Sequence, residues 1–157
     1  MEDKNAAKPL FELPERLKNT IIAKSGVAKA KLVVQKALSK TDVGRLSIQK
    51  HEIRTNFLKD EEQRVPDTQL GGKAQVIAME LIDPSGETST VNPRKYDSMH
   101  CYSYTLTSQW KRVATKNGLE LGTVVQLWAF RDATEKLCFV LVDVEKENER
   151  RLKKQGL

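Results

Sequence analysis

TVVQLWAFRDATEKLCFVLVDV, residues 123–144, contains two long apolar runs separated by the short polar segment RDATE. Valine, leucine, phenylalanine and tryptophan dominate both runs, and β-branched and aromatic residues favour strands. A short polar connection between two such runs predicts a β-hairpin. The dense apolar content further predicts central strands that are buried on both faces.

Five further segments with strand-like composition precede this hairpin, and they give about seven strands in total. They are residues 31–38, 45–49, 74–83, 87–91 and 101–107. Short strands at this spacing, with brief helices between them, indicate a mostly antiparallel β-barrel or sandwich. We expect segments 31–38 and 45–49 to pair with each other across a turn at Asp42 and Gly44, because aspartate and glycine suit turns, glycine by accepting positive φ.

Three helices are predicted between or before the strands. Leu13, Leu17 and Ile21 recur every four residues, which predicts an amphipathic helix that begins near Pro14 and stops at Ser25-Gly26. A short helix is expected over 50–58, where Ile53 and Phe57 are four residues apart. The third helix has Thr107 or Ser108 as its cap, Trp110 and Val113 on its buried face, and Asn117-Gly118 at its end.

The 157 residues suffice for one domain with tails. We expect a disordered tail over 1–9, an N-terminal helix over 10–26, the main domain over 27–145 and a charged tail over 146–157, the last a frayed helix or disordered. Both tails are expected to be dispensable for folding. Residues 59–73 are charged and contain proline and glycine, so we expect a surface loop there.

The chain has 27 basic and 21 acidic residues and a net charge of +6, a balance that permits binding to a polyanion. Between positions 31 and 59 there are two acidic residues and seven basic ones, namely Lys31, Lys36, Lys40, Arg45, Lys50, Arg54 and Lys59. Cys101 and Cys138 form no Cys-x-x-Cys pair, so two free thiols of an intracellular protein are expected. We find no apolar signal-peptide core and no membrane-spanning run, and expect no membrane association.

Residues suited to catalysis are sparse. His100 and Cys101 are neighbours, and neighbouring strand residues point to opposite faces, which disfavours a nucleophile pair or a shared metal site. LGGKA at 70–74 lacks the spacing of a phosphate loop. We therefore expect no enzyme, no cofactor and no metal, and we interpret Trp110 and Trp128 as core residues.

Two polar, basic segments remain, SKTDVGR at 39–45 and NPRKYDSMHCY at 92–102, both expected as loops. Their cations suit phosphates, and their other polar side chains can hydrogen-bond to base edges. By composition alone, two solvated turns explain them equally well.

The stretches SKTDVGRLSIQK, YTLTSQWKRVATKNGLELGTVVQLWAFRD and KLCFVLV together resemble the plant-specific B3 DNA-binding domain. That family has a Ser/Thr-Asp-Val turn, then Arg-Leu-x-Ile-Pro-Lys, and later a Trp-bearing helix, Asn-Gly-Leu and Gly-Asp-x-Val. The match covers about residues 31–144, and LPERL at 13–17 is similar to the helix preceding the domain in the reproductive-meristem-like subgroup. Gln49 stands in place of the motif proline and Thr123 in place of its aspartate.

The resemblance implies a seven-stranded open pseudobarrel and a nuclear transcription factor that binds double-stranded DNA. It also implies two arms that enter the major groove. The first would contain Lys40, Thr41, Gly44 and Arg45; the second would contain Arg94, Lys95, Tyr96, Ser98, Met99, His100 and Tyr102. The alternative is a pseudobarrel that has lost specific DNA reading and binds proteins, through the acidic segment 60–67 or the N-terminal helix. Protein partners or self-association are compatible with both hypotheses.

Overall fold

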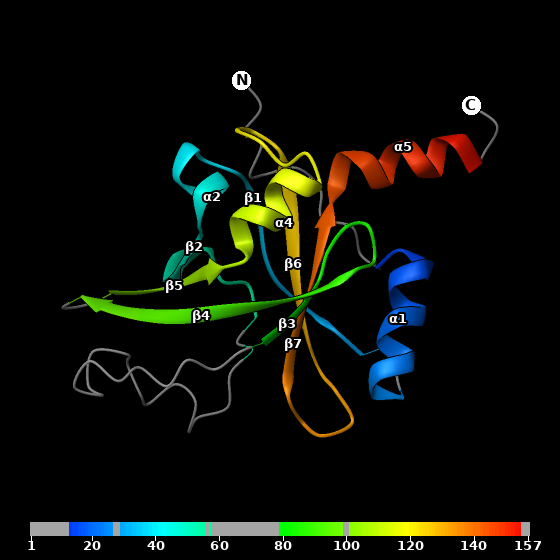
Figure 1. Cartoon of the computed structure of the whole chain (residues 1–157), viewed down its shortest axis with the longest axis horizontal. Coiled ribbons are helices and arrows are strands. Elements are labelled where there is room, and N and C mark those ends of the chain that lie inside the picture. The colour runs from blue at the N-terminus through cyan, green and yellow to red at the C-terminus, as the bar shows by residue number, and fades with distance from the viewer. Residues whose placement is uncertain (1–12, 27–28, 56, 58–78, 99–100, 155–157) are drawn as a thin grey trace.

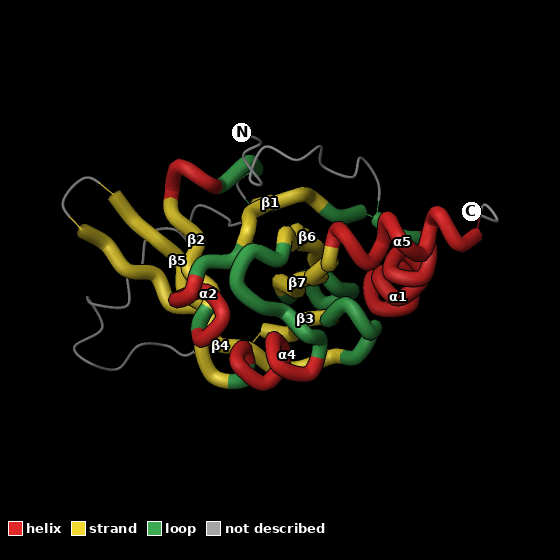
Figure 2. The backbone as a smooth tube through the Cα atoms, turned by 90° about the horizontal axis from the view of Figure 1, so that it is seen from above, coloured by secondary structure: helices red, strands yellow, loops and turns green. Residues whose placement is uncertain are grey.

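One sheet contains the seven strands found in the described part of the chain, in the order β1-β6-β7-β3-β4-β5-β2. The structure is a computed structural model that describes residues 13–26, 29–55, 57, 79–98 and 101–154. The sheet curls into a nearly closed barrel (Figures 1 and 2). The strands are β1 (Lys31–Ala37), β2 (Leu46–Gln49), β3 (Met79–Ile82), β4 (Thr88–Ser98), β5 (Cys101–Ser108), β6 (Val124–Arg131) and β7 (Leu137–Asp143).

The hairpin predicted from residues 123–144 is confirmed, because β6 and β7 pair antiparallel with Leu127 opposite Leu141. Every residue of β7 is buried, as its apolar content requires. The remaining antiparallel pairs are β1–β6, β2–β5, β3–β4 and β4–β5, whereas β3 and β7 run parallel. The strand count and the mostly antiparallel barrel class are thus as predicted.

The hairpin that we expected between residues 31–38 and 45–49 is wrong. Strands β1 and β2 lie at opposite ends of the strand order and pair with β6 and β5, respectively. The chain between them forms the short helix α2 (Lys40–Gly44) rather than a hairpin turn. Gly44 is part of this helix and is absent from the residues with positive φ, so its expected turn role is also wrong.

Hydrophobic side chains pack on both faces of the β6–β7 hairpin. The barrel interior contains Leu46, Leu106, Trp110 and Phe139, all at most 1% exposed. A second cluster lies on the outer face, where Leu17 and Ile21 of α1 (Glu15–Ser25) cover strand residues that include Trp128, Phe130 and Val140. Trp110 and Trp128 are therefore core residues, as predicted.

Helix α1 matches its predicted span and ends at Gly26, which has φ 85°, a left-handed conformation that glycine tolerates. Helix α4 (Trp110–Lys116) buries Trp110 and Val113 as predicted. Its N-cap is Gln109, without a side-chain cap bond, instead of Thr107 or Ser108. In the described residues of the range 50–58 the expected helix is not formed, and a single 3-10 turn, η2, covers Lys50–Glu52.

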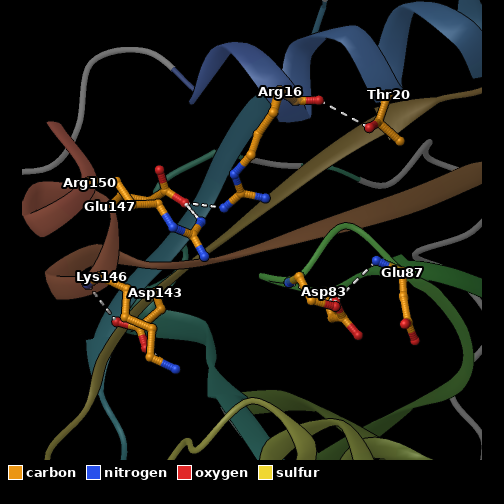
Figure 3. A network of polar contacts seen from close by, with 9 residues as sticks. Arg16, Thr20, Asp83, Glu87, Asp143, Lys146, Glu147 and Arg150 are labelled. Carbon is orange, nitrogen blue, oxygen red and sulfur yellow. Dashed lines mark hydrogen bonds and ion pairs between the residues drawn. The ribbon is translucent and has the colours of Figure 1, made fainter. Parts of the chain in front are cut away.

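The C-terminal segment that we predicted as a charged tail forms helix α5 (Val144–Lys154). Figure 3 shows that Arg16 of α1 donates to the carboxylate of Glu147, which is 5% exposed, and Arg150 donates to the same oxygen over 2.7 Å. Lys146 Nζ donates to the carbonyl of Asn117 over 2.7 Å. Helix α5 is thereby attached to both α1 and the end of α4. Predicted segments 1–9 and 59–73 lie outside the described residues.

Among the residues that the structure describes, we find no helix with both the length and the apolar character needed to cross a membrane.

Candidate nucleic-acid interface

The two basic segments singled out in the sequence come together through strand β5. Strand β5 pairs on one side with β2, which directly follows α2 and Arg45, and on the other side with β4. Segment 39–45 and the β4–β5 hairpin consequently lie on the same side of the barrel, opposite α1 and α5 (Figures 1 and 2). We call the stretch Ser39–Arg45 the first arm and the β4–β5 hairpin beyond Asn92 the second arm.

The first arm is shaped by a capping box at the start of α2. Ser39 Oγ accepts the backbone N–H of Asp42 over 3.2 Å, and Asp42 Oδ2 accepts the N–H of Ser39 over 2.9 Å. Asp42 Oδ1 also accepts the N–H of Ser47 over 3.1 Å, so one carboxylate connects the start of the arm to β2. Asp42 is 2% exposed, and its carbonyl accepts the indole N–H of Trp110 over 2.7 Å.

The outer surface of this arm carries the side chains that we predicted as DNA contacts. Lys40, Thr41, Gly44 and Arg45 are all exposed. Among the described residues, neither Lys40 nor Arg45 has an ion-pair or hydrogen-bond partner for its side chain. Exposed, uncompensated cations favour an anionic ligand.

The second arm is an extended strand pair rather than the polar loop expected over residues 92–100. Backbone pairing continues to the end of β4, with Arg94 opposite Thr105, Tyr96 opposite Ser103 and Ser98 opposite Cys101. Arg94 is exposed. The backbones of Lys95 and Tyr102 lie in β4 and β5.

Six predicted contacts of the second arm fall outside the part of the chain that the structure describes. Met99 and His100 lie outside the described residues, as do the side chains of Lys95, Tyr96, Ser98 and Tyr102. The structure therefore brings the two arms together at the level of their backbones, with Lys40, Arg45 and Arg94 as exposed cations.

Sequence reasoning missed the role of Lys36, which it counted with the other basic residues. Lys36 is only 8% exposed, and its Nζ lies 3.1 Å from Asp42 Oδ2 and 3.3 Å from Glu52 Oε2. Nζ also donates to the carbonyl of Ser47 over 2.8 Å. Strand alternation could have revealed this, since Lys36 lies two residues from Val34 and from Leu38, both buried in the interior.

The other basic residues between positions 31 and 59 are exposed, unlike Lys36, wherever the structure describes them. Lys31, Lys50 and Arg54 are exposed, and Lys59 lies outside the described residues. His51 is exposed as well. In the described ranges, no group of three or more histidine, cysteine, aspartate or glutamate residues is placed to hold a metal ion.

Comparison with known proteins places this architecture in a family. The family model described as B3 domain-containing protein At2g31720-like matches residues 11–145. The Arabidopsis thaliana B3 domain-containing protein At2g31420 is 27% identical over 135 residues, covering 82% of this chain and 65% of that protein. The Arabidopsis thaliana putative B3 domain-containing protein At2g27410 is 29% identical over 136 residues, covering 82% and 53%.

A solved structure with the same fold is that of the Arabidopsis thaliana transcription factor LEC2, determined in complex with DNA. It superposes with a TM-score of 0.51 at 16% identity, covering 73% of this chain and 96% of that chain. The fold is thus the seven-stranded pseudobarrel that the sequence resemblance implied.

The class of protein defined by this barrel and its two arms is the B3 domain. The chain belongs to the B3 domain family, in the At2g31720-like group whose model spans α1 through β7. It spans about two thirds and about half of the length of the two curated relatives above. The assignment to the reproductive-meristem-like subgroup stays a prediction.

Proposed function

We propose that this chain binds double-stranded DNA with a preference for particular sequences and acts as a nuclear plant transcription factor rather than as an enzyme. The observation that carries the proposal is that β5 pairs with both β2 and β4 and so places the two arms side by side. Lys40, Arg45 and Arg94 are exposed on these arms. Membership in the B3 family supports it, and LEC2, which shares the fold, was solved with DNA.

The two arms would approach a duplex from either side of the major groove. Arg45 follows directly after α2, and its fork of five N–H donors suits the O6 and N7 acceptors of guanine. Lys40 lies in the first turn of α2 and suits a phosphate, because an ammonium is a compact point charge. The second arm would contribute the residues that the resemblance to the B3 domain assigns to it, namely Arg94, Lys95, Tyr96, Ser98, Met99, His100 and Tyr102.

The test begins with binding to random duplex DNA at increasing salt concentration. Phosphate contacts release counterions, so the logarithm of the binding constant should fall linearly with the logarithm of salt concentration. Selection from a random duplex library then supplies a preferred sequence. Absence of binding even at low salt would refute the proposal and favour the protein-interaction module.

Two substitutions separate base reading from phosphate contact. Arg45→Ala should weaken binding to the preferred duplex by roughly 5- to 150-fold and leave a scrambled duplex almost unchanged. Lys40→Ala should weaken both duplexes to a similar extent and lower the salt slope by about one.

Matched controls are available at the far end of the molecule. Arg151 and Lys153 are exposed on α5, on the side away from the arms (Figure 1). Arg151→Ala and Lys153→Ala remove the same charges as the arm variants, so any effect of net charge alone appears in them too. An Arg45→Ala variant that behaves like Arg151→Ala would exclude base reading by Arg45.

A further inference from the structure

We propose that Lys36 is the positioning residue of the first arm. It fixes where Arg45 points and so supports the choice of sequence without itself touching DNA. This inference rests on the proposed DNA-binding function. The starting observation is that one buried ammonium joins β1, α2 and the turn that follows β2.

Lys36 has three N–H donors, and three acceptors surround Nζ within 3.3 Å: Ser47 O, Asp42 Oδ2 and Glu52 Oε2. A lysine has no further donor to offer. The Lys36 side chain is 10% exposed, those of Asp42 and Glu52 3% and 18%. Lys36 is therefore saturated and shielded, in contrast to Lys40 four residues later, which is exposed.

The two carboxylates hold the backbone on both sides of Arg45. Asp42 accepts the N–H groups of Ser39 and Ser47, and Glu52 Oε1 accepts the N–H of Gln49 over 2.8 Å. Lys36 connects both carboxylates to β1. The segment that carries Arg45 is thus tied down at its start by Asp42 and at its end by β2 and η2.

This connection also joins the two ends of the sheet. Strands β1 and β2 are the terminal strands and are not paired with each other. Lys36 on β1 donates to Ser47 O on β2, and the N–H of Arg54 donates to Val33 O over 2.7 Å. The first arm bridges the same gap, so its placement relative to the second arm depends on these contacts as well as on the pairing of β2 with β5.

Base reading and phosphate contact differ in how much misplacement they tolerate. A bidentate arginine–guanine contact needs both the distance and the plane of the guanidinium to be correct. Attraction of a lysine to phosphates falls off gradually with distance. A displaced arm should therefore lose sequence preference while it keeps background affinity.

The experiment compares two charge-neutral double variants. Lys36→Met with Glu52→Gln removes the buried cation and one carboxylate, and the glutamine can still accept the N–H of Gln49. Lys24→Met with Glu80→Gln removes a second ion pair, of 3.0 Å, between α1 and β3. Helix α1, which carries Lys24, lies on the side of the barrel opposite the arms (Figures 1 and 2), and neither variant changes the net charge of the protein.

The measurements are binding to the preferred and the scrambled duplex, and amide hydrogen exchange of the free protein. The Lys36/Glu52 variant should lose roughly tenfold in preference for the selected duplex, while binding to the scrambled duplex stays within about twofold. The amides of Ser47 and Gln49 should exchange faster. The Lys24/Glu80 variant should keep the parent's preference and amide protection. An unchanged preference in a folded Lys36/Glu52 variant would overturn the proposal.

A milder pair of variants covers the case in which the double variant does not unfold cooperatively. Glu52→Gln alone keeps Lys36 with Asp42 and should lower the preference by about threefold relative to Glu80→Gln, which has the same change in charge. Equal preference in these two single variants would refute the proposal. If the parent binds no duplex, the proposed function and the sequence-reading role fail together, whereas amide exchange still shows whether Lys36 holds the arm.

Discussion

Replacement of Leu17 by alanine tests whether α1 is an integral part of the folded domain. Leu17 is fully buried, and α1 covers the outer face of the β6–β7 hairpin. The variant leaves α1 a good helix former, because alanine has the highest helix propensity. Any loss of stability then reports the packing of α1 on the sheet.

The magnitude follows from the surroundings of Leu17. Its cluster consists largely of side chains on strands, including Trp128 and Val140, and a paired sheet cannot easily move to fill a cavity. Leu→Ala substitutions at buried sites cost about 2–5 kcal/mol, and a site that cannot collapse lies in the upper half of that range. We expect about 3–4 kcal/mol, which lowers the Tm of a domain of this size by roughly 10 °C.

The assay is thermal and urea unfolding, monitored by circular dichroism and tryptophan fluorescence. Trp128 lies in the cluster under α1, and Trp110 is the first residue of α4 and packs in the barrel interior, so the fluorescence reports both sides of the sheet. Ile22→Ala on the same helix is the control, since Ile22 is 43% exposed and should change stability by less than about 0.5 kcal/mol. A Leu17→Ala variant as stable as Ile22→Ala would show that α1 does not pack on the sheet in solution.

Three further predictions concern titration, reactivity and the C-terminal helix. Burial acts to raise the pKa of Asp83, but hydrogen bonds from Ser85 and Lys116 outweigh it and hold the pKa below its ordinary value. A carboxyl group whose pKa is lower in the folded than in the unfolded protein stabilises the folded state at pH values above its unfolded pKa. Asp83→Asn should therefore lower the Tm at pH 7, and the difference in Tm from the parent should shrink as the pH falls below about 4. A pH-independent difference would contradict this. Burial raises the pKa of Cys138 to about 11, so iodoacetamide at pH 8 should modify the peptide containing Cys138 in urea but not in the native protein. Deletion of residues 146–157 should lower Tm because the ion pair between α5 and α1 is lost, and an unchanged Tm would restore the view of this segment as a dispensable tail.

Elements with a strong local pattern were predictable from the sequence. The apolar runs of β6 and β7 predict buried strands, and the four-residue repeat of Leu13, Leu17 and Ile21 predicts α1 together with its buried face. In these elements, burial and periodicity are properties of neighbouring residues, so a short window of sequence contains them.

Strand pairing was less predictable because it depends on distant partners. Residues 31–38 and 45–49 are close in sequence and similar in composition, but no local feature indicates that each prefers a strand from the second half of the chain. Residues 92–98 read as a loop because they are polar, yet their ladder with β5 uses backbone groups that every residue except proline supplies.

The candidate site was predictable to a similar degree. The resemblance selected both arms, and the strand order places β2 and β4 on either side of β5, whereas the contacts of individual side chains with DNA stay predictions. Lys36 shows why counting charges is insufficient: its burial depends on the strand it occupies and on two carboxylates, one of them sixteen residues later.

The strand order also determines when, during folding, the first arm can take shape. β1 pairs with β6, nearly one hundred residues further along the chain, and β2 pairs with β5. Contacts of such long sequence separation close large loops and raise the contact order, which slows folding. A nascent chain whose β6 is still inside the ribosome has no partner for β1, and so no fixed starting point for the arm. The first arm therefore takes its final position late in folding, after β1 and β2 have both paired with strands from the second half of the chain.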